Sequence, residues 1–256
     1  MLTLKHNYLM ELLFVSLDQR NHITIGMELM ENGSVEKYLA NPDNLIYLKD
    51  AVKWLYQTAK GMLYLYDNGG IHNDLAARNL LLDKDCNIKI ADFGLAKRTG
   101  KFLPEYIQYE TNLTAAMPLW MLAPEVLELH VQRKNMLFTD KSDVWEFGLL
   151  MWEVLSRGIK PFNEHPKLFF RDDIQAFINN LKTGKRPFLP PVLMVRNQTE
   201  LDQLWSVITN CLQLNPSKRP KISELVNPLR TVMIFCFKNS EVVSWTNFLI
   251  FFLVFK

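Results

Sequence analysis

Apolar positions along the chain follow two periods, short strand-like runs near the start and helical spacing later. Residues 9–15 and 22–30 are apolar segments separated by the polar run DQRN, which predicts a hairpin of two strands. Between residues 48 and 67 the apolar positions recur three and four residues apart, which predicts one long amphipathic helix. The sequence DNGG then ends that helix, because polar residues followed by glycine favour a turn.

Further short strands are predicted at 80–82 and 87–91, and residues 92–120 show no regular period. A loop of that length in a compact domain is typically functional. Helical spacing then returns in four segments, at 142–156, 172–183, 200–213 and 219–230. Strands that gather early and helices that gather late predict a mostly helical α+β fold.

Composition narrows the class of protein without naming a function. The 256 residues are 48% hydrophobic and 22% charged, as in ordinary globular proteins with a sizeable core. A net charge of +2 is too small to favour a nucleic acid or a membrane surface as the main partner. The three cysteines have no metal-binding spacing, and their odd number argues against a disulfide framework, so a reducing compartment is expected.

Two apolar runs, at 232–237 and 248–255, mark the end of the chain. Each is shorter than the roughly 20 residues that a membrane-spanning helix needs. We expect a buried or loosely packed apolar tail over 231–256, and contact with a partner or a membrane through 232–255 stays open as the alternative.

The first group of chemically suggestive residues is the sequence HNDLAARN at 72–79. In a loop between a helix and a strand, Asp74 can orient an attacking hydroxyl and accept its proton, while Asn79 offers an oxygen to a metal ion. Taken alone, the spacing is also compatible with a polar capping loop or a small-molecule phosphotransferase. The sequence DFG follows at 92–94, where Asp92 can hold Mg²⁺ against phosphates and Gly94 permits a sharp turn.

Together these residues resemble the catalytic loop and the DFG motif of protein kinases. Three later motifs extend the resemblance over about residues 1–230: APE at 123–125, SDVW with FG at 142–148, and C-x4-P-x2-R-P at 211–220. The resemblance implies a protein kinase-like fold, with a mostly helical C-terminal lobe at 31–230 and a remnant β-hairpin of the N-terminal lobe, with the hinge, at 1–30. It also implies that Asp143 caps amides of the catalytic loop and that Arg219 pairs with Glu125.

Within that family, the sequence is more similar to the tyrosine kinases. Serine/threonine kinases carry a lysine two residues after the catalytic aspartate, where this chain has Ala76, and the basic residue stands instead at Arg78. Pro118 lies where tyrosine kinases place a proline that shapes the shelf for a tyrosine. Trp120 and Met121 stand where that shelf usually has a basic residue and a tryptophan, so the sequence departs from the family pattern at two positions there.

The resemblance also implies a site for ATP and Mg²⁺. Met27 takes the gatekeeper position, and the backbone of Glu28 and Met30 is expected to bond adenine. Leu81 would form the floor under the base, and Asn79 and Asp92 would hold the metal. An apolar strand is equally compatible with a plain core role for Met27 and Leu81.

Two departures bear on activity. Asn73 replaces the arginine that commonly pairs with a phosphorylated residue of the activation segment, so phosphorylation of Tyr106 or Tyr109 is expected to couple weakly to activity. The chain also has no G-x-G-x-x-G loop and no upstream V-A-I-K-like lysine, two parts that phosphoryl transfer in this family uses. Weak or absent transfer is expected, together with exposure of the apolar surface that the absent strands would normally cover.

The function implied is therefore ATP-dependent protein tyrosine phosphorylation, with a tyrosine-bearing protein substrate and no nucleic acid partner. Asp74, Arg78 and Asn79 would be catalytic. The alternatives are a pseudokinase-type scaffold and an incomplete product of a longer gene. The expected location is cytoplasmic, or the cytoplasmic face of a membrane if the parent protein is a receptor.

Overall fold

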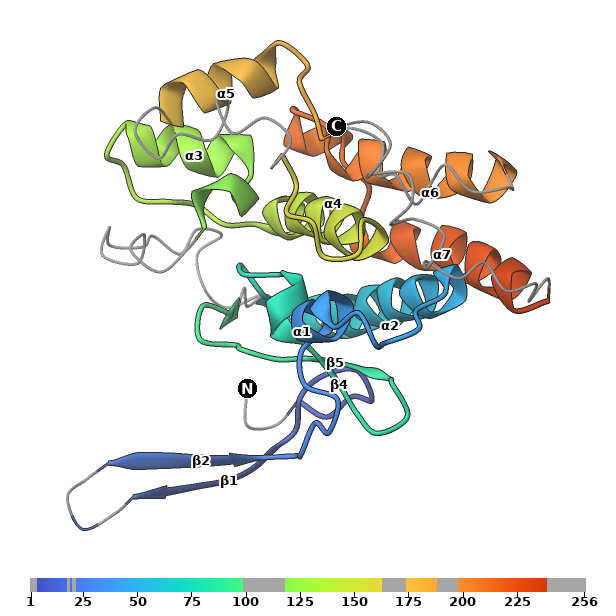
Figure 1. Ribbon diagram of the computed structural model, residues 1–256. Coiled ribbons are helices and arrows are strands. Elements are labelled where there is room, and N and C mark those ends of the chain that lie inside the picture. The colour runs from blue at the N-terminus through green and yellow to red at the C-terminus, as the bar shows by residue number, and fades with distance from the viewer. Residues whose placement is uncertain are drawn as a thin grey trace.

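A computed structural model describes residues 4–17, 19, 22–98, 118–162, 174–187 and 198–238. Within these residues the chain forms a helical body with three small two-stranded sheets. Figure 1 shows the early hairpin, β1 (Leu12–Leu17) with β2 (Ile23–Met27), at its lower end and α1 (Val35–Ala40) and α2 (Leu48–Asp67) above it. Helix α4 (Asp140–Leu155) lies in the middle, and α3 (Pro124–Val131), α5 (Ile174–Lys182) and α6 (Gln198–Cys211) lie at the opposite end. The predicted α+β architecture, mostly helical with a small β-hairpin, is confirmed.

The early hairpin consists of β1 (Leu12–Leu17) and β2 (Ile23–Met27), which pair antiparallel with an irregular register between Leu12 and Phe14. The predicted hairpin is thus confirmed, with shorter and shifted strands. Phe14 lies opposite Gly26, where an added Cβ would come within 2.2 Å of the phenyl ring. The glycine therefore gives the ring its space across the two strands.

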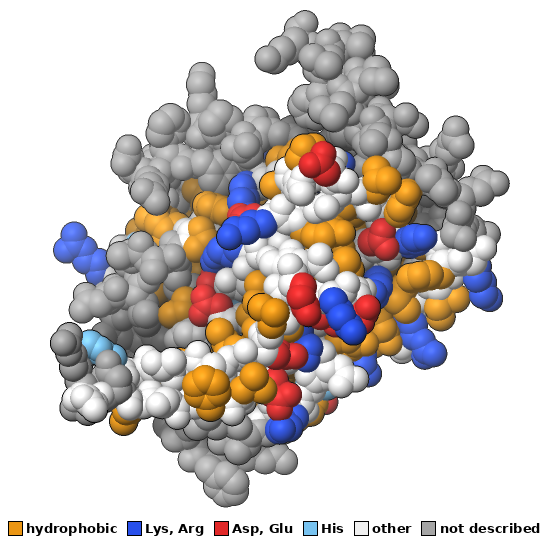
Figure 2. Space-filling model, turned by 60° about the horizontal axis from the view of Figure 1, so that its bottom comes forward, with side chains coloured by type: hydrophobic (Ala, Val, Ile, Leu, Met, Phe, Trp, Pro, Cys, Tyr) orange, Lys and Arg blue, Asp and Glu red, His pale blue; other side chains and the backbone are white. Residues whose placement is uncertain are grey.

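The hairpin exposes apolar side chains along both strands. The exposed fraction is 56% for Phe14, 63% for Leu17 and 67% for Ile23, so neither face of this two-stranded sheet is covered by the described residues. Figure 2 shows orange apolar side chains along the hairpin at its lower left. An exposed apolar surface is therefore present, and it lies on the hairpin.

The first two helices pack against the next strands. Ser34 caps α1 (Val35–Ala40), which has no counterpart among the predicted elements, and α2 (Leu48–Asp67) has the predicted bounds. Two further strand pairs follow: β3 (Gly70–Ile71) with β6 (Lys97–Arg98), and β4 (Leu80–Leu82) with β5 (Ile88–Ile90). At Gly61 of α2, an added Cβ would lie 2.8 Å from Ile90 Cδ1, so glycine permits close packing of α2 on β5.

Five helices complete the described body: α3 (Pro124–Val131), α4 (Asp140–Leu155), α5 (Ile174–Lys182), α6 (Gln198–Cys211) and α7 (Ile222–Lys238). Single 3-10 turns lie at Ala77–Asn79, Leu119–Met121 and Pro216–Lys218. The predicted helices correspond to α4, α5, α6 and α7, whereas α3 was not predicted. The expected loop at 92–120 contains β6 and one of these turns, and its residues 99–117 lie outside the described part.

Helix α7 runs further than the sequence predicts. It continues through Pro228 to Lys238, so the predicted end at residue 230 is wrong. The helix packs along α2 and buries Leu229 and Val232, and this burial outweighs the local cost of proline. The apolar run at 232–237 is therefore helical, while 239–256 lies outside the described residues, and the division of the chain at 231 stays a prediction.

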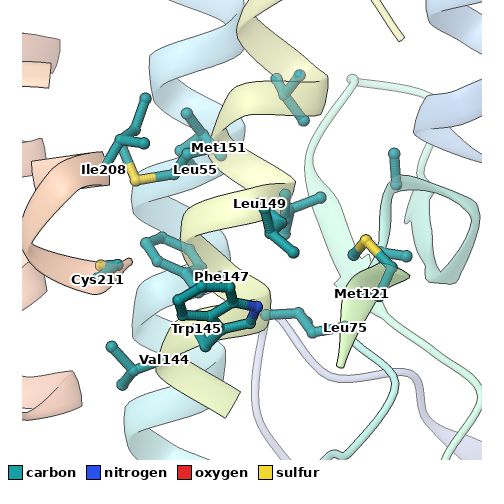
Figure 3. Packing of buried hydrophobic residues seen from close by; sticks show 14 of the residues in the cluster. Leu55, Leu75, Met121, Val144, Trp145, Phe147, Leu149, Met151, Ile208 and Cys211 are labelled. Carbon is teal, nitrogen blue, oxygen red and sulfur yellow. The ribbon is translucent and has the colours of Figure 1, made fainter. Parts of the chain in front are cut away.

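Helix α4 forms the centre of the core. Every residue from Ser142 to Leu155 is buried, and Figure 3 shows Trp145 and Phe147 among side chains from several elements. An added Cβ at Gly148 would lie 2.8 Å from Cys211 Cβ, so α4 and α6 approach closely there. The described residues contain no helix long and apolar enough to span a membrane.

Candidate active site

The loop at 72–79 brings three of the predicted site residues together between β3 and β4. Asp74 forms an ion pair with Arg78 through one carboxylate oxygen, Oδ1. Its other oxygen, Oδ2, accepts a hydrogen bond of 2.8 Å from Asn79 Nδ2, and the same nitrogen donates to the Asp74 carbonyl at 2.7 Å. The Asp74 carboxylate is thus oriented from both sides, and the Asn79 amide keeps its oxygen for another partner.

Asp92 comes directly after Ala91, whose backbone is hydrogen-bonded to this loop. The Ala91 amide donates to the Asn79 carbonyl at 2.8 Å, and His72 Nε2 lies 3.0 Å from the Ala91 carbonyl. Asp92 itself is exposed and adopts a φ of +58°, in the left-handed region. The end of β5 is therefore tied to the catalytic loop, with the Asp92 carboxylate open to solvent.

The donor atoms fit a magnesium ion bound with phosphate. Asp92 offers a carboxylate and Asn79 an amide oxygen, and Mg²⁺ usually binds through one or two carboxylates plus substrate phosphates and water. Across the described residues, no group of three or more His, Cys, Asp or Glu side chains forms a metal-binding cluster. One carboxylate and one amide oxygen would leave coordination positions of such an ion for phosphate and water.

Helix α4 holds the catalytic loop through buried carboxylates. The Asp143 carboxylate accepts bonds from the backbone amides of His72, at 2.7 Å, and Asn73, at 2.8 Å, so its predicted capping role is confirmed. Burial raises the pKa of Asp143 to about 7, against the lowering effect of these two bonds. Burial lowers the pKa of His72, so its neutral form is favoured.

Two further carboxylates of α4 reach the same loop, and neither was found by the sequence reasoning. Glu146 accepts from the Leu75 amide at 2.8 Å, and Glu153 accepts from the Ala77 amide at 3.1 Å. Glu153 also forms an ion pair with Lys160. Burial, followed by the nearby charge of Asp143, raises the pKa of Glu146 well above its usual range. Their one sequence signal is an acidic residue inside an otherwise apolar helical segment.

Asn73, the residue that departs from the family pattern, has a defined place in the structure. Its φ is +65°, a left-handed conformation that asparagine adopts more readily than most residues. Its side-chain Nδ2 donates to the Leu95 carbonyl at 3.0 Å, which connects the catalytic loop to the segment after DFG. Tyr106 and Tyr109 lie outside the described residues, so their weak coupling to activity stays a prediction.

The residues expected to contact the nucleotide lie on connected elements. Met27 ends β2 with 53% of its surface exposed, and Glu28 forms an ion pair with Lys89 at 2.9 Å. The Met30 carbonyl accepts from the Gly33 amide, and the segment after it pairs with β4 at Leu81. Leu81 is half-buried, unlike its fully buried neighbours in the strand. The structure thus brings these residues into one region, and their contact with adenine stays a prediction.

The APE motif is anchored from the other side of the core. Glu125 forms two hydrogen bonds with Arg219, of 2.6 and 2.7 Å, and the Arg219 side chain is fully buried. This ion pair was implied by the resemblance and is confirmed. It fixes the start of α3, just after the 3-10 turn that begins beyond Pro118.

Comparison with known proteins agrees with this geometry. A family model described as "Protein tyrosine and serine/threonine kinase" matches residues 1–229. The chain is also 30% identical over 233 residues to the tyrosine-protein kinase receptor svh-2 of Caenorhabditis elegans, an alignment that covers 89% of this chain and 19% of the receptor. The chain therefore spans about a fifth of the length of this curated relative.

Proposed function

The chain belongs to the protein tyrosine and serine/threonine kinase family, and on that premise we propose that it transfers the γ-phosphoryl group of ATP to a tyrosine hydroxyl in a protein. The observation that carries the proposal is the Asp74 carboxylate, held between Arg78 and Asn79 beside the end of β5. A cytoplasmic location, or one on the cytoplasmic face of a membrane, belongs to the same proposal.

Asp74 would act on the acceptor hydroxyl. Its carboxylate orients the tyrosine hydroxyl and accepts the proton as the phenolic oxygen bonds to the γ-phosphorus. The bond from that phosphorus to the bridging oxygen breaks, and ADP leaves with the electron pair. Arg78, paired with Asp74 and 31% exposed, is placed to support the substrate or the transferring phosphoryl group.

The nucleotide would lie between the hairpin and the catalytic loop. In the proposed arrangement, the backbone of Glu28 and Met30 bonds adenine, with Met27 and Leu81 as apolar contacts. Asn79 and Asp92 would hold the Mg²⁺ ion that neutralises charge on the phosphate oxygens when it is bound. The half-buried Leu81 and the exposed Asp92 support this assignment, since both leave surface for a ligand.

Preference for tyrosine over serine rests on residues around the loop. Ala76 is buried and stands where a serine/threonine kinase would place a lysine, while Arg78 supplies the positive charge two residues later. Pro118 directly precedes the 3-10 turn Leu119–Met121, which leads to Glu125 in the first turn of α3. The kinase name of the curated relative supports the same preference.

The test is transfer of radiolabelled phosphate from ATP to peptides that differ only in having tyrosine, serine or phenylalanine at the acceptor position. We expect slow labelling of the tyrosine peptide alone, because the chain has no glycine-rich phosphate loop. Asp74→Asn should reduce transfer by at least about 100-fold, as expected for loss of a general base. Asp85→Asn, at an exposed acidic residue of the β4–β5 turn, is the matched control and should change little.

A second candidate function is a binding protein without phosphoryl transfer, which the exposed apolar hairpin favours. Transfer by the unmodified chain at the same level as Asp74→Asn would refute the kinase proposal and favour this candidate. Equal labelling of the serine and tyrosine peptides would retain the kinase activity but reject the preference for tyrosine.

A further inference from the structure

Two carboxylates of α4 bind the catalytic loop on opposite sides of Asp74 in the sequence. Asp143 accepts from the amides of His72 and Asn73, which precede Asp74. Glu146 accepts from the amide of Leu75, which follows it, at 2.8 Å. The two acids lie three residues apart on one helix, so they face the loop from the same side.

The hydrogen bond between Glu146 and the Leu75 amide lies in the protein interior. Glu146 is 1% exposed and Leu75 is fully buried, so the hydrogen bond between them is shielded from water. Figure 3 shows the Leu75 side chain reaching from the loop toward α4 near Trp145. A buried amide without an acceptor destabilises the fold by the full desolvation penalty of that group. By accepting from the Leu75 amide, Glu146 removes this penalty and stabilises the loop conformation.

We propose that Glu146 is a positioning residue for Asp74, which holds the backbone just after the catalytic aspartate while Asp143 holds the backbone just before it. The inference rests on the proposed function and adds a second anchor to the one implied by the family resemblance. A displacement of about 1 Å at a reacting group can lower a rate by about 100-fold. Holding both sides of Asp74 therefore bears directly on turnover.

Three substitutions separate positioning from a general loss of stability. Glu146→Ala removes the acceptor for the Leu75 amide, whereas Glu146→Gln keeps an acceptor oxygen of similar reach. Met151→Ala is the matched core control, because Met151 is fully buried on the same helix and Figure 3 shows it directed toward Leu55 and Ile208 rather than toward the loop.

The experiment measures amide hydrogen exchange at Leu75 and steady-state phosphoryl transfer in the full chain, with turnover expressed per folded molecule. Glu146→Ala should raise exchange at Leu75 by about tenfold or more and lower kcat by about 10- to 100-fold, with the KM for peptide within about twofold. Glu146→Gln should recover both quantities to within about threefold of the unmodified chain. Met151→Ala should change neither beyond its effect on global stability.

Unchanged exchange at Leu75 in folded Glu146→Ala would overturn the inference, as would an equal loss of kcat in Met151→Ala. A Glu146→Gln variant as impaired as Glu146→Ala would also overturn it. If Glu146→Ala does not fold, Glu146→Met fills the space without an oxygen acceptor and takes its place. If the unmodified chain transfers no phosphate, the proposed function fails, and exchange at Leu75 alone then decides whether Glu146 holds the loop.

Discussion

The ion pair between Glu125 and Arg219 allows a stability measurement with an internal control on the same helix. The Arg219 side chain is fully buried, and the Glu125 side chain is 29% exposed. Arg219 also donates to the backbone carbonyls of Gln213 and Lys141, both at 2.8 Å, and its guanidinium lies 5.1 Å from the ring centre of Trp145. The charge is therefore enclosed by the protein, with one carboxylate to balance it.

Replacement of Glu125 by glutamine keeps the size of the side chain and removes its charge. Loss of one partner from a buried ion pair typically costs about 3–5 kcal/mol, because the remaining charge stays buried without compensation. Partial exposure of Glu125 lets water replace some of the lost interaction, so we expect about 3 kcal/mol. That value corresponds to a decrease of roughly 100-fold in the ratio of folded to unfolded protein.

Glu128 provides the control, since it lies on α3 as well and pairs with Lys182 at 2.6 Å. These two side chains are 38% and 52% exposed, and exposed ion pairs contribute only about 0–1 kcal/mol. Glu128→Gln should therefore change the free energy of unfolding by less than about 1 kcal/mol. Both free energies of unfolding would be measured by urea denaturation at neutral pH, with tryptophan fluorescence as the signal.

A double substitution tests the cause of the loss. If the uncompensated charge of Arg219 is responsible, addition of Arg219→Met to Glu125→Gln should recover part of the lost stability, in a non-additive cycle. A cost below about 1 kcal/mol for Glu125→Gln, or an equal cost for Glu128→Gln, would show that burial of Arg219 does not control the strength of this pair.

Three further predictions concern pH, the hairpin and helix packing. Because burial raises the pKa of Asp143 from 3.8 to about 7, the folded state binds more protons than the unfolded chain in this range. The contribution of Asp143 to stability should therefore be full below about pH 4 and be lost as the pH rises through 7. In a plot of the free energy of unfolding against pH, the decrease over this range should be smaller for Asp143→Asn than for the unmodified chain. Phe14→Lys, on the exposed hairpin, should reduce self-association in light scattering without changing the helical circular dichroism signal, and undiminished association would exclude the hairpin as its source. Gly148→Ala should lower stability by about 1–3 kcal/mol in urea denaturation, because the new methyl group would meet Cys211 at 2.8 Å, and an unchanged stability would mean that α4 and α6 can separate slightly.

The parts of the fold that were predictable from sequence are those where a local pattern coincides with burial. Helix α2 has the predicted bounds because Val52, Leu55, Ala59 and Met62 form one buried face. Helices α1 and α3 are only six and eight residues long, too short for such a pattern to stand out. Their signals were the cap at Ser34 and the proline at the first position of α3, which are individually common.

The C-terminal end of α7 could not be predicted from the residues around it. Pro228 lies inside the helix, where it removes a backbone donor, and a sequence pattern ending at 230 is the natural expectation. The helix continues because Leu229 and Val232 are buried in its packing with α2, a segment far away in sequence. Tertiary contacts of this kind override the local helix propensity, and the pattern of a single sequence does not show which distant segments will pack together.

The candidate site shows the same division between local and distant information. Asp74, Arg78 and Asn79 lie within one short loop, so the sequence motif that contains them could single them out before their contacts were known. The role of Glu146 depends on how α4 crosses beneath that loop, 71 residues away along the chain. From sequence alone, an acidic residue within a helix is predicted to lie at the surface, because ionised side chains are seldom fully buried.

Backbone conformation joins these observations. Asn73 and Asp92 both adopt left-handed φ values, and such conformations persist only where surrounding contacts determine them. Positive φ also occurs at Cys86 and Arg157, in turns away from the site, so strain alone does not identify function. What distinguishes Asn73 is that its amide is bound by Asp143 while its side chain binds the Leu95 carbonyl. The residue that departs from the family motif is therefore a link between helix α4 and the segment after DFG, and it holds the two together through neutral side-chain and backbone donors rather than through an arginine.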